Sequence, residues 1–404
     1  MRMKKLNDNW ADDASSASQL STEAILGIVT IVEEMHSAIT KTSKLGLKRK
    51  NKGGLSGFIF SVIRFFTRAT GFGLQHGFKQ LSKALPASEA SSTPSQQREA
   101  LLAIVNGVLG NHLVEMNSPS AIPMRFRLNG KSVNLTEFST SSKPVLLMVH
   151  GLCMNDLQWT RKGHNHGEKL CAKFGFRPLY LHYNSGRHIS QNGEELNEHL
   201  ENLVNHLTPE TPIHLLLHSM GGLITRSAFE MAKNGGYSWP ERIDSLFFLG
   251  TPHHGAPMEK AGNWIDTMLE SNKYSAPLSR LGKIRSAGIT DMRWSNLSHE
   301  DWQNRDRFHR KHKPLKHIPL PSDIPCFTVA ASKSNEPKLF SDHTLGDGLV
   351  TLHSALGEHR LKDKRLTFQP ERSHIVRGIS HFALLESQNV YEKLEYWFAD
   401  LVDG

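Results

Sequence analysis

Cysteine is scarce in this 404-residue chain, which contains only Cys153, Cys171 and Cys326. An odd number of cysteines gives no complete disulfide framework, and a chain of this length can bury a sufficient core without one. We therefore expect a reducing compartment, in which each thiol packs as a small apolar side chain. Cys153 lacks the strand-to-helix context of a nucleophile, so packing is the better interpretation for it as well.

Long apolar runs are also absent. The nearest candidate, residues 57–66, is interrupted by Arg64 and is too short to cross a bilayer. Residues 1–19 are polar and lack the apolar centre of a secretory signal. We therefore expect a cytoplasmic protein with neither a transmembrane helix nor a signal peptide.

Acidic residues are fewer than basic residues. The chain has 39 Asp and Glu residues and 48 Lys and Arg residues, which gives a net charge of +9. Basic residues gather at positions 44–52, beside the apolar segment 57–66, and again at positions 305–316. Such faces suit peripheral contact with an anionic membrane, and they are equally typical of a solvated surface. No nucleic-acid motif accompanies them. The oligomeric state is not fixed by the sequence.

A serine stands where an apolar run meets a helix-compatible stretch. Ser219 follows residues 213–217 and precedes Met220, Gly221 and Gly222. A nucleophile elbow needs a small residue two places after the serine, because the helix backs closely onto the strand. Gly221 meets this requirement, although Leu217 replaces the first glycine of the usual GxSxG pattern. The sequence predicts that Ser219 is a nucleophile.

An earlier apolar run, residues 145–149, leads into His150, Gly151 and Leu152. Acyl transfer develops negative charge on a carbonyl oxygen, and fixed backbone N–H groups stabilise that charge. We predict that Leu152 supplies one such amide and Met220 the other. The loss of one donor typically lowers the rate by roughly 10²–10³-fold.

A third apolar run, residues 326–330, precedes Asp347, which lies between two glycines, and then His381. The chain order of serine, acid and histidine is that of α/β-hydrolases. We predict that His381 transfers the proton and that Asp347 orients its imidazole. Other residues compete for these two roles: His343, His353 and His374 for the base, and Asp244 and Asp342 for the acid.

Three further histidines lie near these motifs. His218 precedes the serine and is expected to pack or hydrogen-bond locally. His253 and His254 follow the apolar run 246–249 and are expected to form part of the site's rim rather than a metal site. The sequence predicts no metal ion and no cofactor.

Taken in order, these segments resemble bacterial lipases and esterases, and also the lipase-like domain of GPI-inositol deacylases. The resemblance covers about residues 140–404 and includes the motifs LGTPHHG at 249–255 and HFALL at 381–385. It implies a carboxylic ester hydrolase that works through an acyl-enzyme, with apolar acyl chains and a lid at residues 256–324. A thioesterase, acyltransferase or peptidase would use the same triad. A non-catalytic binding protein on this scaffold is the remaining alternative.

The expected fold is α/β: an α/β-hydrolase with a mostly parallel sheet flanked by helices, a helical N-terminal extension and a cap insertion. Residues 1–121 would form the extension, with a linker near 86–97, and residues 122–404 the catalytic domain. An Asn-Gly turn at 129–130 predicts an opening hairpin with strands at 124–128 and 133–135. The other expected elements are strands at 145–149, 177–183, 213–217, 243–249 and 326–330 and helices at 23–39, 101–114, 194–207 and 390–401.

Overall fold

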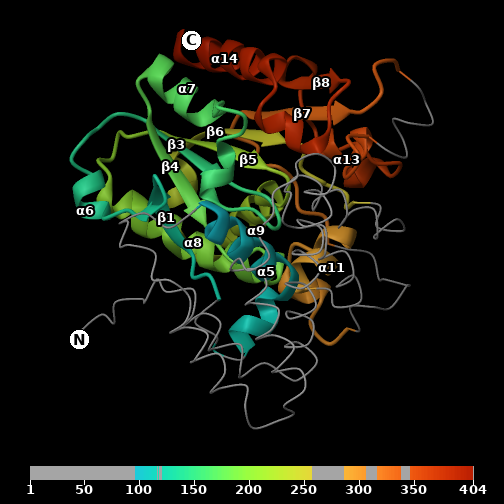
Figure 1. The fold of residues 1–404 in the computed structure, drawn as a ribbon, viewed down its shortest axis with the longest axis horizontal. Helices are drawn as coiled ribbons and strands as arrows, with labels where there is room; N and C mark the ends of the chain where they lie inside the picture. The colour runs from blue at the N-terminus through green and yellow to red at the C-terminus, as the bar shows by residue number, and fades with distance from the viewer. Residues whose placement is uncertain are drawn as a thin grey trace, which may run out of the picture.

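The computed structural model describes residues 96–115, 117, 121–256, 286–305, 316–337 and 346–403 (Figure 1). The expected helix at 23–39, the basic cluster at 44–52, the apolar segment at 57–66 and nearly all of the linker at 86–97 lie outside these residues. So does much of the expected cap, at 257–285 and 306–315.

The described residues form one eight-stranded sheet with the order β2-β1-β4-β3-β5-β6-β7-β8. β1 pairs antiparallel with β2 and β4, and every other neighbouring pair is parallel. The expected α/β-hydrolase fold is therefore confirmed. The strands are β1 (Arg125–Leu128), β2 (Lys131–Ser132), β3 (Val145–Val149), β4 (Arg177–His182), β5 (Ile213–His218), β6 (Ile243–Leu249), β7 (Cys326–Ser332) and β8 (Ser373–Arg377).

Helices cover both faces of the sheet. In Figure 1, α8 and α9 lie on one side of it, while α7 and α14 lie on the other. The helices are α5 (Gln96–Glu115), α6 (Leu135–Phe138), α7 (His166–Phe174), α8 (Ile189–His206), α9 (Met220–Gly235), α11 (Ala287–Trp294), α13 (Leu352–Ala355) and α14 (Gln388–Asp403). Short 3₁₀ turns are η3 (Asp156–Trp159), η4 (Trp239–Arg242), η7 (His299–Asp301), η8 (Lys362–Lys364), η9 (Pro370–Arg372) and η10 (His381–Leu385).

The central strands are apolar because they are covered on both sides. Every residue of β3, β5 and β7 is buried, as expected for parallel strands between two layers of helices. This explains why the strands appear in the sequence as continuous apolar runs.

The opening hairpin turns where expected, with positive φ at both Asn129 (51°) and Gly130 (75°). Its second strand lies at Lys131–Ser132 and not at the predicted residues 133–135, because helix α6 begins at Leu135. The side chain of Asn134 accepts a hydrogen bond from Thr136 N and caps that helix.

Helix α8 begins earlier than the predicted residue 194. Its first turn is stabilised from elsewhere in the chain, since the carboxylate of Asp291 accepts the N–H of Ile189 at 3.0 Å. An acidic group at a helix N-terminus is favourable. No local pattern could indicate a capping residue so distant in sequence.

Helix α5, which precedes the hairpin, packs into the same core as the sheet. Ile104, Val108 and Leu113 are buried and belong to the main hydrophobic cluster. Glu99 also reaches Arg127 on β1, at 2.7 Å. Among the described helices, none is both long and apolar enough to span a bilayer.

Candidate active site

Ser219 lies in the sharp turn between β5 and α9. Its backbone has φ 55° and ψ −121°, and its N–H donates to Leu249 O at 2.9 Å. A positive φ is unfavourable for a residue with a Cβ, and it is retained when the surrounding fold demands it. This strained turn from strand to helix is the geometry of a nucleophile elbow.

Helix α9 packs closely against β3, and this contact limits which residue types fit around the serine. A Cβ on Gly221 would lie 2.5 Å from Val149 O, so only glycine fits two places after Ser219. Leu217, in place of the usual first glycine, is fully buried in β5 and pairs with Val149 and Phe248 on the neighbouring strands. That position is an interior strand residue here, so leucine is accommodated.

The turn after β3 passes directly beside the serine. A Cβ on Gly151 would lie 3.0 Å from Ser219 Cβ. Met220 is the first residue of α9, and its N–H has no partner inside the helix. For the N–H of Leu152, no acceptor is found among the residues that the structure describes. Both predicted oxyanion donors therefore lie on turns next to Ser219.

The carboxylate of Asp347 is fully buried and is held by three donors. One oxygen accepts the N–H groups of Leu349 (2.9 Å) and Val350 (2.8 Å), and the other accepts Nδ1 of His381 (2.6 Å). Because an ionised carboxylate only accepts, Nδ1 of His381 carries the proton. Nε2 is then the basic nitrogen of the ring.

His381 lies at the carboxyl ends of the central strands, where Ser219 also lies. Its ring centroid is 4.9 Å from that of His218, the residue before the serine. A Cβ on Gly250, directly after β6, would lie 3.0 Å from His381 Cε1. The structure thus brings the imidazole and the carboxylate into contact and places both next to the serine turn.

The competing residues are placed elsewhere. His353 pairs with Glu358, and His374 lies on β8 opposite Val329. Asp244, at the amino end of β6, lies 3.3 Å from His214. The other two competitors, His343 and Asp342, fall outside the described residues. Of the candidates that are described, His381 and Asp347 are the pair in mutual contact.

His218 is buried and packs edge-on against Trp159, with ring centroids 6.3 Å apart. Burial, reinforced by nearby His381, holds the pKa of His218 well below its ordinary value, so it remains neutral. It therefore packs next to the serine turn as an uncharged ring.

His253 and His254 join the loop after β6 to the segment that follows Asp347. His253 N–H donates to Ser354 O at 3.1 Å, and the ring of His254 bonds Gly357 O at 2.9 Å. Burial lowers the pKa of His254 to about 4, despite its bond to Gly357. Within the described ranges, no group of three side chains is placed to bind a metal ion.

All three cysteines are buried and free of disulfides. Burial raises the pKa of each of the three thiols to about 12. Each is therefore a protonated, unreactive thiol at neutral pH.

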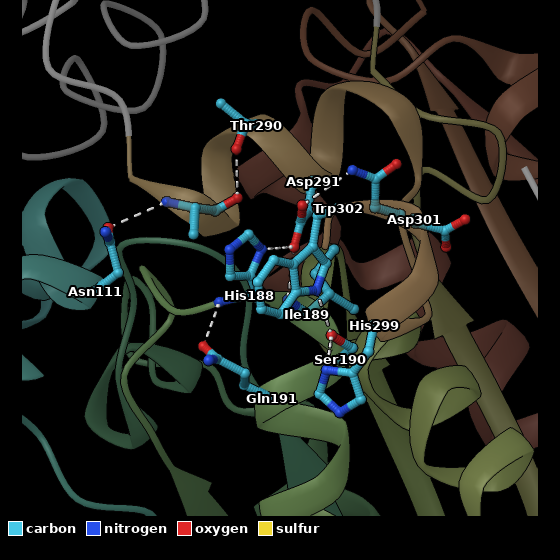
Figure 2. A network of polar contacts seen from close by, with 12 residues as sticks. Asn111, His188, Ile189, Ser190, Gln191, Thr290, Asp291, His299, Asp301 and Trp302 are labelled. Atoms are coloured by element: carbon cyan, nitrogen blue, oxygen red, sulfur yellow. Dashed lines mark hydrogen bonds and ion pairs between the residues drawn. The ribbon is translucent and has the colours of Figure 1, made fainter. Parts of the chain in front are cut away.

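Residues 286–305, one of the described parts of the expected cap, lie beside the elbow. A Cβ on Gly288 would lie 3.1 Å from Met220 Cε. Figure 2 shows how this segment is attached to the start of α8: Asp291 accepts His188 Nδ1 at 2.8 Å, and Trp302 stacks on the ring of His188 with centroids 3.7 Å apart. Sequence reasoning missed this network, because its partners are about a hundred positions apart.

Part of the chain matches a known protein family. Residues 139–319 match the model of a family described as a PGAP1-like alpha/beta domain. No curated protein matches the chain.

Several solved bacterial structures are similar. The mature Bacillus licheniformis lipase BlEst2 is 17% identical, with a TM-score of 0.41, covering 69% of this chain and 98% of that one. A lipase-esterase related protein from Clostridium acetobutylicum is 14% identical (TM-score 0.37; 69% and 99% covered). Staphylococcus hyicus lipase is 16% identical (TM-score 0.37; 67% and 97% covered). The sheet topology is that of an α/β-hydrolase, and residues 139–319 are similar to the PGAP1-like alpha/beta domain.

Proposed function

We propose that this protein is a serine hydrolase that cleaves carboxylic esters with apolar acyl chains through an acyl-enzyme. In this proposal Ser219 Oγ is the nucleophile and His381 Nε2 is the general base. Asp347 holds the imidazole in the required tautomer and stabilises its charged form. The N–H groups of Leu152 and Met220 stabilise the oxyanion.

The proposal depends chiefly on one observation: a buried, hydrogen-bonded pair of Asp347 and His381 beside a strained serine turn. A buried carboxylate is costly unless it is fully hydrogen-bonded. Asp347 has three donors, and one of them is an imidazole whose remaining nitrogen is basic. If these residues served only to pack the core, neither the strained backbone of Ser219 nor this orientation of the His381 ring would be required.

The reaction follows from these roles. Ser219 Oγ bonds to the ester carbonyl carbon while its proton passes to His381 Nε2, and the carbonyl oxygen takes the negative charge. Collapse of this intermediate breaks the bond to the alcohol oxygen, which leaves with the proton from His381. Water, deprotonated by His381, then attacks the acyl-enzyme and releases the carboxylic acid and the free serine.

Fluorophosphonate labelling with mapping of the adduct tests the nucleophile. We expect the label on Ser219, and we expect Ser219→Ala to abolish both labelling and turnover of nitrophenyl esters without lowering thermal stability. His374→Ala is the matched control for a histidine outside the pair, and it should retain turnover. A label on another residue would remove the assignment. No labelling and no turnover in the wild-type chain would favour a non-catalytic binding protein.

The acyl group and leaving group are tested by comparing substrates. The same triad can serve esters, thioesters and amides, so the fold alone does not choose between them. We expect kcat/KM to be highest for esters and to rise with acyl chain length. Faster turnover of a matched thioester or amide would reassign the activity to a thioesterase or peptidase, and transfer to an added alcohol in preference to water would reassign it to an acyltransferase.

Membrane contact and location complete the proposal. The net charge of +9 would favour an anionic lipid surface on which apolar esters are dissolved. We expect binding to vesicles containing phosphatidylglycerol that weakens as salt is raised, and no binding at low salt would exclude contact with an anionic membrane.

Three free, buried thiols support a reducing compartment such as the cytoplasm. Fractionation of cells is the direct measurement.

A further inference from the structure

We propose that Ser185 and helix α5 are positioning elements for the oxyanion turn, a role that rests on the proposed function. Ser185 lies in the loop after β4, and α5 precedes the segment that carries the hydrolase motifs. Neither belongs to a recognisable motif. Both contact the turn that presents the N–H of Leu152.

The peptide that carries this N–H is fixed at its other end by His150. The carbonyl of Gly151 and the N–H of Leu152 belong to one peptide plane. His150 Nδ1 donates to Gly151 O at 2.9 Å, and the His150 ring stacks on Tyr183 with centroids 4.2 Å apart. Burial lowers the pKa of His150 to about 3, so the ring stays neutral at the working pH.

The next peptide is fixed by Ser185. Cys153 N–H donates to Ser185 Oγ at 3.0 Å, and both residues are buried. Cys153 has φ 58°, a conformation that residues with a Cβ rarely adopt. The bond to Ser185 therefore holds a strained residue directly after the predicted oxyanion donor. Without it, the turn could relax and rotate the N–H of Leu152 away from the substrate.

Helix α5 supports the same turn from behind. A Cβ on Gly107 would lie 2.8 Å from Cys153 Cα and would overlap Cys153 Sγ. The backbone of α5 and the oxyanion turn are thus in direct contact, with room for a hydrogen atom only.

The same helix holds the loop that carries Ser185. Asn184 Nδ2 donates to Gly110 O on α5 at 3.0 Å, and Gly186 N–H donates to Asn184 Oδ1 at 3.1 Å. Residues 286–305 also contact α5, since Ala287 N–H donates to Asn111 Oδ1 at 3.2 Å (Figure 2). α5 therefore contacts Cys153 and the two residues that flank Ser185, Asn184 and Gly186.

The first test is Ser185→Ala in the full chain. A small misplacement of a catalytic group typically costs up to about 10²-fold in rate, and complete loss of one oxyanion donor costs about 10²–10³-fold. We expect kcat for a nitrophenyl ester to fall by about 10- to 100-fold with little change in KM. The dissociation constant of an alkyl boronic acid, whose serine adduct places an oxygen at the oxyanion position, should rise by a similar factor.

Ser245→Ala is the matched control. Ser245 is also a buried serine with one side-chain bond, to His214 Nδ1 at 2.8 Å, but it lies near the amino end of β6, away from Ser219. We expect a comparable loss of thermal stability and unchanged kcat. A structural effect of Ser185 alone would resemble this control.

Gly107→Ala tests helix α5 separately. Alanine favours the helix, so a loss of kcat must come from contact with the turn. We expect kcat to fall about tenfold or more, and Gly107→Ala combined with Cys153→Ala to recover part of that loss because the overlapping Sγ is removed.

Unchanged kcat and boronic acid affinity in both Ser185→Ala and Gly107→Ala would overturn the positioning role while leaving the hydrolase assignment intact. Lower thermal stability without lower kcat would overturn it equally. If the wild-type chain shows no turnover that depends on Ser219, the proposed function fails first, and the positioning role fails with it.

Discussion

His381 Nδ1 lies 2.6 Å from Asp347 Oδ2, while Asp347 Oδ1 accepts two backbone N–H groups from its own loop. The loop thus fixes the carboxylate, and the carboxylate fixes the imidazole. A second backbone bond, from His381 N to Asp347 O at 3.2 Å, joins the two segments as well. The orientation of the ring is therefore set by elements on both sides of it.

Asp347→Asn should lower kcat by about 10⁴-fold, because an amide can present N–H to Nδ1 and favour the wrong tautomer of His381. KM should change little. Steady-state kinetics on a nitrophenyl ester measures both constants, and circular dichroism with thermal melting checks the fold. Asp244→Asn is the control, since Asp244 lies at the opposite end of the sheet strands. Equal losses in the two variants would contradict the role of Asp347.

Short motifs were predicted correctly in position because each is encoded within a few neighbouring residues. The elbow around Ser219 and the buried run of β5 are examples. The parallel strands appear as apolar runs because they are buried on both faces of the sheet. The pairing of His381 with Asp347 could be proposed from chain order. Its selection over His353 or His374 required the contact itself.

Contacts between distant segments could not be predicted. Gly107 and Gly110 would count locally as poor helix residues, yet Gly107 is where α5 approaches Cys153 in the turn after β3. Ser185 and Asp291 carry no local pattern, because their partners are Cys153 and His188. Such residues are identified by tertiary packing alone.

Acid should destabilise the protein through His166. Burial lowers its pKa to about 4, although a bond to Leu384 opposes the shift. Nε2 donates to Leu384 O at 2.8 Å and Nδ1 bonds His164 Nε2 at 2.6 Å, so both nitrogens of the neutral ring have hydrogen-bond partners. A folded pKa below the unfolded value of about 6.5 means that the unfolded state binds more protons, so stability falls as pH drops below about 6.5.

The loss from this one histidine should reach roughly 3 kcal/mol by about pH 4. Urea denaturation at several pH values between about 7 and 4 measures the slope of unfolding free energy. His166→Gln should have lower stability at neutral pH and a shallower slope in acid, because the titrating group is gone. His206→Gln, at an exposed position near the end of α8, is the control and should keep the wild-type slope. An identical slope in wild type and His166→Gln would contradict the prediction.

Attachment of residues 286–305 to the start of α8 should depend on Asp291. Its carboxylate accepts His188 Nδ1, Ile189 N and, at 3.1 Å, Asn296 Nδ2, and it is almost fully buried. Asp291→Ala leaves these donors without an acceptor, which we expect to cost about 2–4 kcal/mol of unfolding free energy. Chemical denaturation measures the loss. Limited proteolysis should show faster cleavage within residues 286–305.

The control for this variant is Glu300→Ala, an exposed acidic residue of the same segment. We expect it to change the unfolding free energy by less than about 0.5 kcal/mol. A comparable effect in both variants would mean that loss of negative charge, rather than loss of the network in Figure 2, is responsible.

Arg127 should help to hold α5 against the sheet through a buried ion pair. Its guanidinium is 1% exposed and lies 2.7 Å from Glu99 on α5 and 3.0 Å from Asp156, which in turn lies 3.2 Å from His182. Arg127→Met removes the guanidinium that contacts both buried carboxylates, and removal of one partner of a buried ion pair costs about 3–5 kcal/mol. Urea denaturation should show a loss of this size. Arg127→Met combined with Glu99→Gln should be less destabilised than the sum of the two single variants, because the contact between Arg127 and Glu99 can be lost only once. Strict additivity would show that Glu99 and Arg127 are not coupled.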